Sequence, residues 1–254
     1  MIDIHCHILP GVDDGPKSIK ESLVMAREAV NEGIKTIIAT PHHKNNTYEN
    51  TKNLIIENVN IFNKILQHEN IPLEILPGQE NRIFGEILED YQKGEILTLN
   101  NTKYIFIEFP SSSVPRFAER LLYEIQIEGL TPIIVHPERN KEILEKPSIL
   151  YKFVSNGALT QITAASVAGY FGKSIKKFSY QLIEYNLTHF VASDAHNVSS
   201  RSFKLNEAYE LIRNDFGLDY AYLFLDNSEH LISDNSIIKE IPEEIKKKKF
   251  LGIF

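Results

Sequence analysis

Short apolar strands alternate with amphipathic helices along most of the chain, and this alternation limits the folds open to it. Seven segments rich in β-branched and aromatic residues are predicted to be strands, with a weaker eighth candidate at 95–99. The seven lie at 2–5, 35–40, 73–76, 104–109, 132–135, 159–163 and 189–193. Strands separated by helices pair in parallel through right-handed crossovers. The pattern therefore predicts an α/β fold, a closed or nearly closed barrel.

Helical patterns fill the intervals between these strands. The first helix should begin with a capping box formed by Ser18 and Glu21 and end at Gly33. Its apolar positions at helical spacing are 19, 23, 26 and 30. Further helices are expected at 49–69, 114–128, 141–155, 173–186 and 202–214. No linker, low-complexity stretch or repeat interrupts the series, so residues 1–254 are predicted to form a single domain.

Composition excludes several classes of protein. The net charge is −7 and the one basic block is KKKK at 246–249, which argues against a nucleic-acid surface. That block is predicted to be a solvated tail. The alternative is that it binds weakly to an acidic membrane surface. No apolar run approaches the roughly 18 residues that span a bilayer, and the polar N-terminus is unlike a signal peptide. One cysteine, Cys6, cannot form an internal disulfide, so a cytoplasmic location without an integral membrane segment is expected.

Histidines and carboxylates follow six of the predicted strands at their C-terminal ends. These residues are His5, His7, His42, Glu80, Glu108, His136, Asp194 and His196, and the pair Asp13–Asp14 follows the first strand. In α/β barrels the C-terminal ends of the strands carry the chemistry. Any one of these residues could be an ordinary hydrogen-bonding group at a strand end, but a chance scatter would not place so many of them at one end. They are therefore predicted to form one site.

This donor set is suited to divalent metal ions. Residues i and i+2 of a strand face the same side, so His5 and His7 can converge on one ion. Imidazoles and carboxylates without a thiolate cluster favour Mn²⁺, Fe²⁺ or Zn²⁺ over a structural cysteine site. About nine ligands are too many for one ion and suit two or three. Clustered ions favour phosphoester hydrolysis, in which a metal-activated hydroxide attacks phosphorus.

Arginine is scarce in the chain, with seven copies, and two of them follow the predicted ligands closely. Arg139 comes three residues after His136, and Arg201 comes five residues after His196. A guanidinium grips phosphate as a bidentate fork, so both are predicted to hold the phosphate, although a surface salt bridge is the ordinary alternative. Arg82 and Arg116 are weaker candidates for the same role.

Cys6 stands between two predicted ligands, but strand alternation turns it toward the helices, where a small buried residue is expected. An enzyme that attacks phosphorus with a cysteine thiolate commonly places an arginine six positions after this nucleophile, in the loop that holds the phosphate. That position is Val12 here, and the chain has no second cysteine. The sequence therefore argues against a phosphocysteine mechanism.

Taken together, the motifs resemble those of the PHP (polymerase and histidinol phosphatase) superfamily, and most closely its CpsB/CapC-type bacterial manganese-dependent protein tyrosine phosphatases. The segments that carry the resemblance are IDIHCHILPGVDDG at 2–15, ATPHH at 39–43, LPGQE at 76–80, IEFP at 107–110, HPERN at 136–140 and VASDAH at 191–196. They appear in order over about three quarters of the chain, and no motif position departs from the pattern.

The resemblance implies a distorted (β/α)₇, TIM-like barrel of the PHP type with a trinuclear metal site. The implied ligands are His5, His7, Asp14, His42, Glu80, Glu108, His136, Asp194 and His196. It is the resemblance that selects Asp14 over Asp13. The implied cofactor is Mn²⁺, with Fe²⁺, Zn²⁺ or Mg²⁺ as alternatives, and Arg139 and Arg201 match phosphate-holding positions. The implied partner is the phosphotyrosine cluster in the tail of a bacterial tyrosine kinase, and the implied role is control of capsule or exopolysaccharide synthesis.

Three other interpretations remain open at this point. A PHP small-molecule phosphatase, such as one acting on histidinol phosphate, would share the same ligands. An amidohydrolase also begins with H-x-H, but it usually needs a bridging lysine and a single final aspartate. A degenerate PHP domain could bind a phosphorylated partner without hydrolysing it, but ligands would then be missing.

Overall fold

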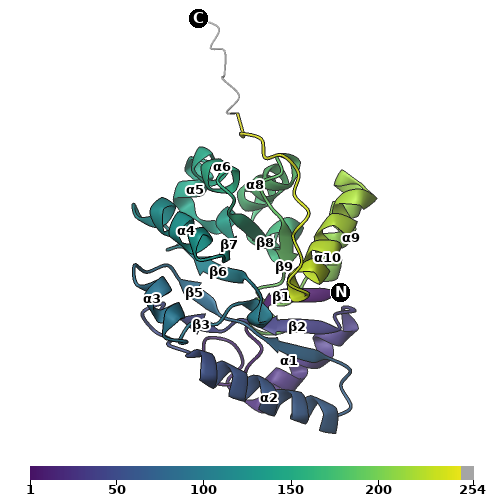
Figure 1. Cartoon of the computed structure of the whole chain (residues 1–254). Helices are drawn as coiled ribbons and strands as arrows, with labels where there is room; N and C mark the ends of the chain where they lie inside the picture. Colours follow the sequence, from purple (N-terminus) through teal and green to yellow (C-terminus); the bar gives the residue numbers. More distant parts are fainter. Residues whose placement is uncertain (247–254) are drawn as a thin grey trace, which may run out of the picture.

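The fold is known from a computed structural model that describes residues 1–246 (Figure 1). Within these residues the strands form two parallel sheets, one with the order β1-β2-β4 and one with the order β3-β5-β6-β7-β8-β9. The strands are β1 (Ile2–Cys6), β2 (Thr36–Ala39), β3 (His42–His43), β4 (Glu74–Pro77), β5 (Glu80–Arg82), β6 (Tyr104–Glu108), β7 (Thr131–Val135), β8 (Leu159–Thr163) and β9 (Phe190–Ala192). The predicted α/β class with parallel strands is confirmed, and each of the seven strong strand predictions matches a strand.

The two sheets are joined where the chain passes directly from a strand of one sheet into a strand of the other. Thr40 and Pro41 separate β2 from β3, and Gly78 and Gln79 separate β4 from β5. Gly78 is required at its crossing, because a Cβ there would lie 2.6 Å from Ile38 Cγ2. At each crossing the chain leaves the small sheet and enters the large one.

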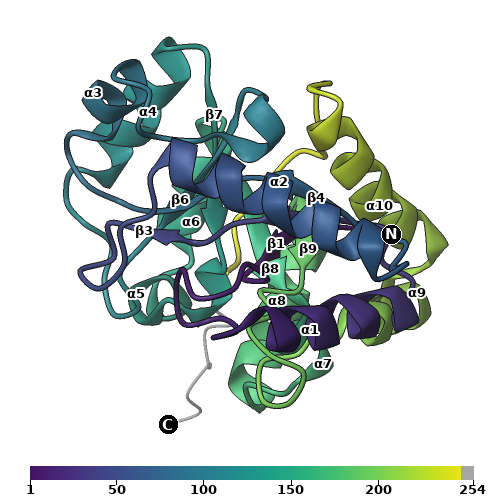
Figure 2. The same ribbon diagram turned by 90° about the horizontal axis from the view of Figure 1, so that it is seen from below.

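Hydrogen bonds also connect the first strand to the segment after the last strand. Asp194 N donates to His5 O (2.8 Å), and His7 N donates to Ala195 O (2.9 Å). The N-terminal strand therefore lies between β2 and the chain that leaves β9, as the central position of β1 in Figure 1 and Figure 2 also shows. This arrangement brings residues near 5 beside residues near 195.

One extra residue in β1 changes the direction of its side chains. Asp3 pairs with Ile37 and Cys6 pairs with Ala39, so three steps along β1 match two steps along β2. Such a bulge breaks the period-2 alternation. Ile4 packs in the apolar cluster between the sheets, and the His5 ring also faces that interior, 5.0 Å from the ring of Phe106.

The helices cover the outer faces of the sheets (Figure 1, Figure 2). They are α1 (Ile19–Asn31), α2 (Lys52–His68), α3 (Ile87–Gln92), α4 (Ala118–Ile127), α5 (Lys141–Glu145), α6 (Ser148–Ser155), α7 (Ala164–Ala168), α8 (Lys173–Glu184), α9 (Leu205–Phe216) and α10 (Leu218–Ile232), with short 3₁₀ turns at Leu99–Asn101 and Pro137–Arg139. The Ser18 hydroxyl accepts from Glu21 N as predicted, but the Glu21 carboxylate accepts from Lys17 N and not from Ser18 N.

The predicted buried face of α1 was partly wrong. Ile19 is 46% exposed, whereas Ser22, Met25, Ala26 and Ala29 face the core. Three of these four residues are small, and small side chains let the helix lie close to the sheet. Apolar spacing alone does not detect a face built from alanine and serine.

Two further predictions were wrong. The segment 95–99 is not a strand, because its backbone bonds to other groups: Leu97 N donates to the Gln79 side chain, and Glu95 O accepts from Lys52 N. The helix predicted at 141–155 is two helices, α5 and α6, separated at Pro147, which has no N–H to continue α5. The helices α3, α7 and α10 were not predicted.

Two apolar clusters stabilise the fold. The larger one lies between the helices and the outer faces of the strands. The smaller one fills the space between the sheets and contains Ile4, Phe106, Val135 and Phe190. Leu231 of α10 joins this inner cluster, and α10 packs on β1 and β9. Packed side chains therefore fill the space between the sheets at the end where α10 lies.

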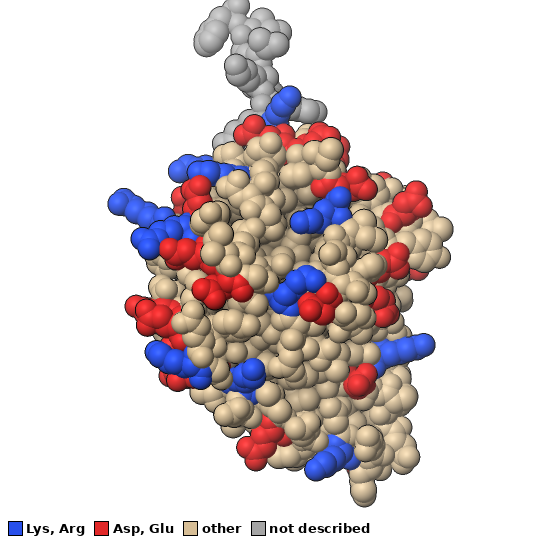
Figure 3. All heavy atoms as spheres, viewed as in Figure 1, with Lys and Arg blue, Asp and Glu red and all other residues tan. Residues whose placement is uncertain are grey.

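Charged side chains of both signs lie on the molecular surface (Figure 3). Lysines, arginines and carboxylates are interspersed on the face shown in Figure 3. Among the described helices none is both long and apolar enough to cross a membrane. The basic run 246–249, apart from Lys246, lies outside the described residues.

Candidate metal centre

The structure brings the nine predicted ligands together at the C-terminal ends of the strands. Each comes from a strand end or from the loop that follows it: His5 and His7 from β1, Asp14 from the next loop, His42 from β3, Glu80 from β5, Glu108 from β6, His136 after β7, and Asp194 and His196 after β9. Seven of them lie in three overlapping groups whose ligand atoms are within 4.8 Å of one another. The groups are His7, Asp14, His42 and His196; His5, His7 and Glu80; and His42, Glu80 and Glu108.

Glu80 is at the centre of this cluster and is fully buried. Its Oε1 lies 2.8 Å from His136 Nε2 and 3.6 Å from His5 Nε2. Its Oε2 lies 2.6 Å from His42 Nδ1 and 3.4 Å from His7 Nε2. The two oxygens thus face different histidines, which is the geometry a carboxylate needs to bridge two ions.

Asp194 and His136 lie outside the three groups but border them. Asp194 Oδ1 is 3.3 Å from His7 Nε2 and 3.5 Å from His5 Nε2. Both residues have left-handed backbone conformations, with φ of +53° at Asp194 and +37° at His136. Non-glycine residues seldom adopt such angles, and in native proteins they cluster at functional sites.

Several buried polar atoms in the cluster have no hydrogen-bond partner within the described residues. They are Glu80 Oε2, Glu108 Oε2, His42 Nδ1 and His196 Nε2. Glu80 Oε2 and His42 Nδ1 are 2.6 Å apart, yet their geometry does not make a hydrogen bond. Buried polar groups are normally satisfied, so these atoms fit the role of metal ligands.

The outer nitrogens of three histidines are held by fixed acceptors. His5 Nδ1 contacts Gln161 Oε1 (2.9 Å), and His7 Nδ1 contacts Asp13 Oδ2 (2.6 Å). His196 Nδ1 contacts the backbone oxygen of Asp194 (2.9 Å). Metal-binding histidines usually donate their second N–H in this way, which leaves Nε2 free for the ion.

The electrostatics of the site also favour cations. Burial, together with the charge of Glu80, raises the pKa of Glu108 to about 7. Crowded carboxylates repel one another unless positive charge is supplied. The donor set, the unpartnered atoms and the crowding all fit a divalent metal centre.

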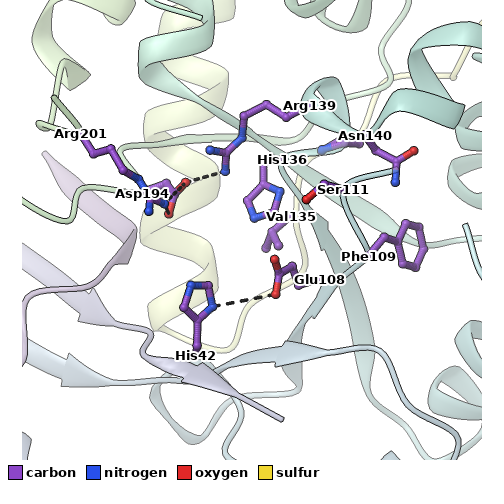
Figure 4. A pocket seen from close by; sticks show the side chains of 11 residues that line it. His42, Glu108, Phe109, Ser111, Val135, His136, Arg139, Asn140, Asp194 and Arg201 are labelled. Carbon is purple, nitrogen blue, oxygen red and sulfur yellow. Dashed lines mark hydrogen bonds and ion pairs between the residues drawn. The ribbon is translucent and has the colours of Figure 1, made fainter. Parts of the chain in front are cut away.

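Both predicted arginines reach this cluster beside an open cavity of about 330 Å³ (Figure 4). Arg139 Nη2 lies 2.5 Å from Asp194 Oδ2, and Arg201 Nη2 lies 3.4 Å from the same oxygen. Arg201 Nη1 also donates to Asp14 Oδ2 (3.0 Å). The two guanidinium groups approach Asp194 from two sides and border the cavity.

The weaker arginine candidates have different surroundings. Arg82 lies 3.1 Å from Glu108 Oε1 and donates to Phe109 O, at the edge of the site. Arg116 lines a separate cavity with Arg120 and Tyr123 and is not among the residues that line the cavity beside the cluster.

Two contacts were missed by the sequence reasoning. The aromatic ring of Phe171 lies 5.3 Å from Arg139 Cζ, a cation–π contact that supports the guanidinium. Gln161 supports His5, and its signal was available, because it is a polar residue with a long side chain within the strand predicted at 159–163.

Cys6 is directed away from the cluster, as predicted. Its side chain is fully buried in the outer apolar cluster, with Sγ 3.5 Å from Ala195 O. The thiol therefore does not face the metal-ligating atoms of His5 and His7.

Comparison with known proteins agrees with this geometry. The family model described as "Capsular polysaccharide synthesis, CpsB/CapC" matches residues 1–233. The chain is 51% identical to tyrosine-protein phosphatase YwqE of Bacillus subtilis over 254 residues, covering both chains completely. It is 40% identical to the putative tyrosine-protein phosphatase CapC of Staphylococcus aureus, again over the full length of both.

Similarity to a solved structure extends to the fold. A crystal structure from a study of Bacillus subtilis YwqE and Streptococcus pneumoniae CpsB, described as unique metal-dependent tyrosine phosphatases, superposes with a TM-score of 0.95 at 51% identity. The match covers 97% of this chain and all of the other. The resemblance inferred from the motifs is confirmed: the chain belongs to the CpsB/CapC family of capsular polysaccharide synthesis.

Proposed function

We propose that this protein is a metal-dependent protein tyrosine phosphatase that acts on the phosphotyrosine cluster in the tail of a bacterial tyrosine kinase and so regulates capsule or exopolysaccharide synthesis. The observation that carries the proposal is the convergence of nine histidines and carboxylates beside Arg139 and Arg201. The names of the relatives, tyrosine-protein phosphatases, support the same activity.

We also infer the architecture of the protein and its location in the cell. We infer one distorted (β/α)₇ barrel of the PHP type over residues 1–254, with β2–β3 and β4–β5 each counted as one strand position. The parallel pairing and the bonds between His5 and Asp194 support this reading. The single buried cysteine supports a cytoplasmic location.

The ligand residues would hold two or three Mn²⁺ ions, or Fe²⁺, Zn²⁺ or Mg²⁺ in their place. Bound divalent cations would supply a water of lowered pKa and neutralise the phosphoryl oxygens. Glu80 would be shared between ions because its two oxygens face different histidines. His5, His7 and His196 would direct Nε2 inward because their Nδ1 atoms are already bonded.

The two arginines would bind the phosphate. Both contact Asp194 in the structure, which keeps their charges next to the cluster. An incoming phosphate dianion would compete for these guanidinium groups, and a fork-like contact would orient its oxygens for attack. Phe171 would hold Arg139 in place by its contact with the guanidinium face.

The burial of the predicted ligands favours phosphotyrosine over shorter phosphorylated side chains as the substrate. Glu108 and Asp194, which are 6% and 4% exposed, line the cavity, and Phe109 lines it in part. A phosphotyrosine side chain is long enough to carry its phosphate inward while its ring contacts apolar groups.

The test is phosphate release after removal of metals with a chelator and dialysis. Activity on a phosphotyrosyl peptide should disappear and should return with Mn²⁺, and the metal-free protein should melt at a lower temperature because ions bind only the folded state. Full activity after exhaustive chelation would refute the metal proposal. Preference for histidinol phosphate would favour a small-molecule phosphatase, and peptide binding without turnover would favour a binding domain.

A further inference from the structure

Asp13 is a buried carboxylate, 3% exposed, in the loop between β1 and α1. We propose that Asp13 is a positioning residue that holds one group of ligands, namely His7, Asp14, His42 and His196, in the geometry that binds a metal ion. This inference rests on the metal centre of the proposed function. It assigns Asp13 a role distinct from that of the neighbouring ligand Asp14.

The strongest contact of Asp13 is with the His7 ring. Asp13 Oδ2 lies 2.6 Å from His7 Nδ1. A carboxylate can only accept a hydrogen bond, so His7 must carry its proton on Nδ1. The lone pair of Nε2 then faces the cluster, where it lies 3.3 Å from both His5 Nε2 and Asp194 Oδ1.

The same carboxylate ties two other segments to His7. The backbone N–H of His42 donates to Asp13 Oδ2 (3.2 Å), and Gly15 N donates to Asp13 Oδ1 (2.9 Å). Asp13 thus connects the end of β1, the start of β3 and its own loop. Since Asp14 is the next residue in that loop, three of the four members of the group depend on Asp13.

The turn at Gly15 is packed closely against His7. A Cβ at Gly15 would lie 2.3 Å from His7 O and 3.0 Å from Asp13 Oδ1. The Lys17 ammonium donates to Asp13 O (2.6 Å), which fixes the backbone of the same turn. The close approach of Gly15 to His7 and the contact of Lys17 both restrict movement of this turn when the carboxylate contacts are lost.

His5 provides an internal comparison. Its Nδ1 contacts the neutral amide oxygen of Gln161, whereas Nδ1 of His7 contacts an anion. Charge-assisted hydrogen bonds are shorter and stronger than neutral ones. Removal of the charge at Asp13 should therefore affect the group of His7, Asp14, His42 and His196, three of whose members depend on Asp13, more than the group of His5, His7 and Glu80, in which only His7 does.

Asp13→Asn is the direct test, because asparagine has nearly the same shape. Its amide offers one acceptor oxygen, so either His7 and His42 or Gly15 must lose an acceptor. Metal-free protein would be titrated with Mn²⁺ by calorimetry, and bound metal would be counted by elemental analysis. We expect one ion per chain to be lost or to bind roughly 10- to 100-fold more weakly, the usual effect of changing a group that supports a metal ligand.

The matched control is Asp90→Asn. Asp90 of α3 is also a buried carboxylate, but it pairs with Lys44, two residues after His42, and with Lys93, and neither lysine is a predicted ligand. Asp90→Asn should lower stability and leave Mn²⁺ stoichiometry and affinity unchanged. If Asp13→Asn binds Mn²⁺ like the wild type, or if Asp90→Asn loses as much metal, the role of Asp13 is overturned.

A measurement on the wild type covers the case in which Asp13→Asn does not fold. In protein labelled with ¹⁵N-histidine and loaded with diamagnetic Zn²⁺, NMR should show His7 protonated on Nδ1. A proton on Nε2 of His7 would overturn the proposal. The metal titration needs no substrate, so normal Mn²⁺ binding by a wild type that does not hydrolyse phosphotyrosine would overturn the proposed function alone.

Discussion

Replacement of Cys6 by alanine separates a metal mechanism from a cysteine mechanism. Cys6 lies between His5 and His7, so a covalent phosphocysteine would be the obvious alternative for a tyrosine phosphatase. The thiol is fully buried in the outer apolar cluster, and its Sγ lies 3.5 Å from Ala195 O. Burial raises the pKa of the Cys6 thiol well above its usual value, with Asp3 and Asp194 adding to the effect, so it stays neutral at pH 7.

The expected cost of Cys6→Ala is modest and affects stability. The change removes one heavy atom of about methylene size, which is worth about 0.8 kcal/mol of transfer free energy, and the small cavity left behind brings the total to roughly 1–2 kcal/mol. In a chain of this length, 1 kcal/mol corresponds to a fall in Tm of about 2–4 °C.

The catalytic geometry should survive the same change. The backbone of residue 6 is held by two bonds that do not involve the thiol: Cys6 N donates to Thr40 Oγ1 (3.2 Å), and Thr40 N donates to Cys6 O (3.0 Å). His5 and His7 should therefore keep their positions. The kcat on a phosphotyrosyl peptide at saturating Mn²⁺ should remain within about threefold of the wild type.

The assay is phosphate release, run beside thermal unfolding and metal counting, with His7→Ala as the variant expected to be nearly inactive. A Cys6→Ala protein that is folded and fully metallated but inactive would refute the reasoning. A phosphocysteine intermediate would then have to be considered.

Three other predictions follow from the site and the core. Glu80→Ala should lose more activity and more bound metal than Glu80→Asp, and unchanged metal by elemental analysis would argue against a bridging role. Arg139→Ala and Arg201→Ala should each lower kcat/KM roughly 10- to 100-fold with metal content intact, and a lysine at either position should restore part of the loss. Replacement of the exposed Arg120 by alanine is the control. If either alanine variant keeps the wild-type kcat/KM, the arginine it replaces does not bind the phosphate. Burial, with a smaller contribution from Lys239, lowers the pKa of His189 to about 3. In the unfolded chain His189 has a pKa of about 6.5 and binds a proton that the folded chain excludes, so the free energy of unfolding should rise with pH between about 3 and 6.5. In urea unfolding, His189→Gln should reduce the slope of this free energy against pH by up to about 1.4 kcal/mol per pH unit. Equal slopes for the variant and the wild type would contradict this prediction.

The strand ends could be predicted because their signals are local. A strand such as 132–135 is recognised from its own residues, and His136 follows it directly in the chain. Parallel pairing then places all such ends on one side without knowledge of the strand order. For this reason the amino-acid sequence alone was enough to place the ligands at one end of the fold.

The features that were missed depend on contacts between distant segments. The segment 95–99 has the composition of a strand, but Gln79 and Lys52 occupy its backbone groups. Nothing near Phe171 in the sequence indicates that it contacts Arg139. Spacing alone left Asp13 and Asp14 undecided, because only the fold brings Asp13 Oδ2 to 2.6 Å from His7 Nδ1 and Asp14 Oδ1 to 3.2 Å from His196 Nε2.

The extra residue in β1 gives one strand two separate roles. Its first part, with Ile2 and Ile4, anchors the inner cluster, and its second part aims His5 and His7 at the metal-binding groups. Without the insertion a strand would offer an apolar face and a polar face on opposite sides, and only one of them could point inward. A deletion of one residue before His5 would therefore rotate the histidines out of the site even if every ligand were retained, so the site requires the spacing of this segment as well as its ligands.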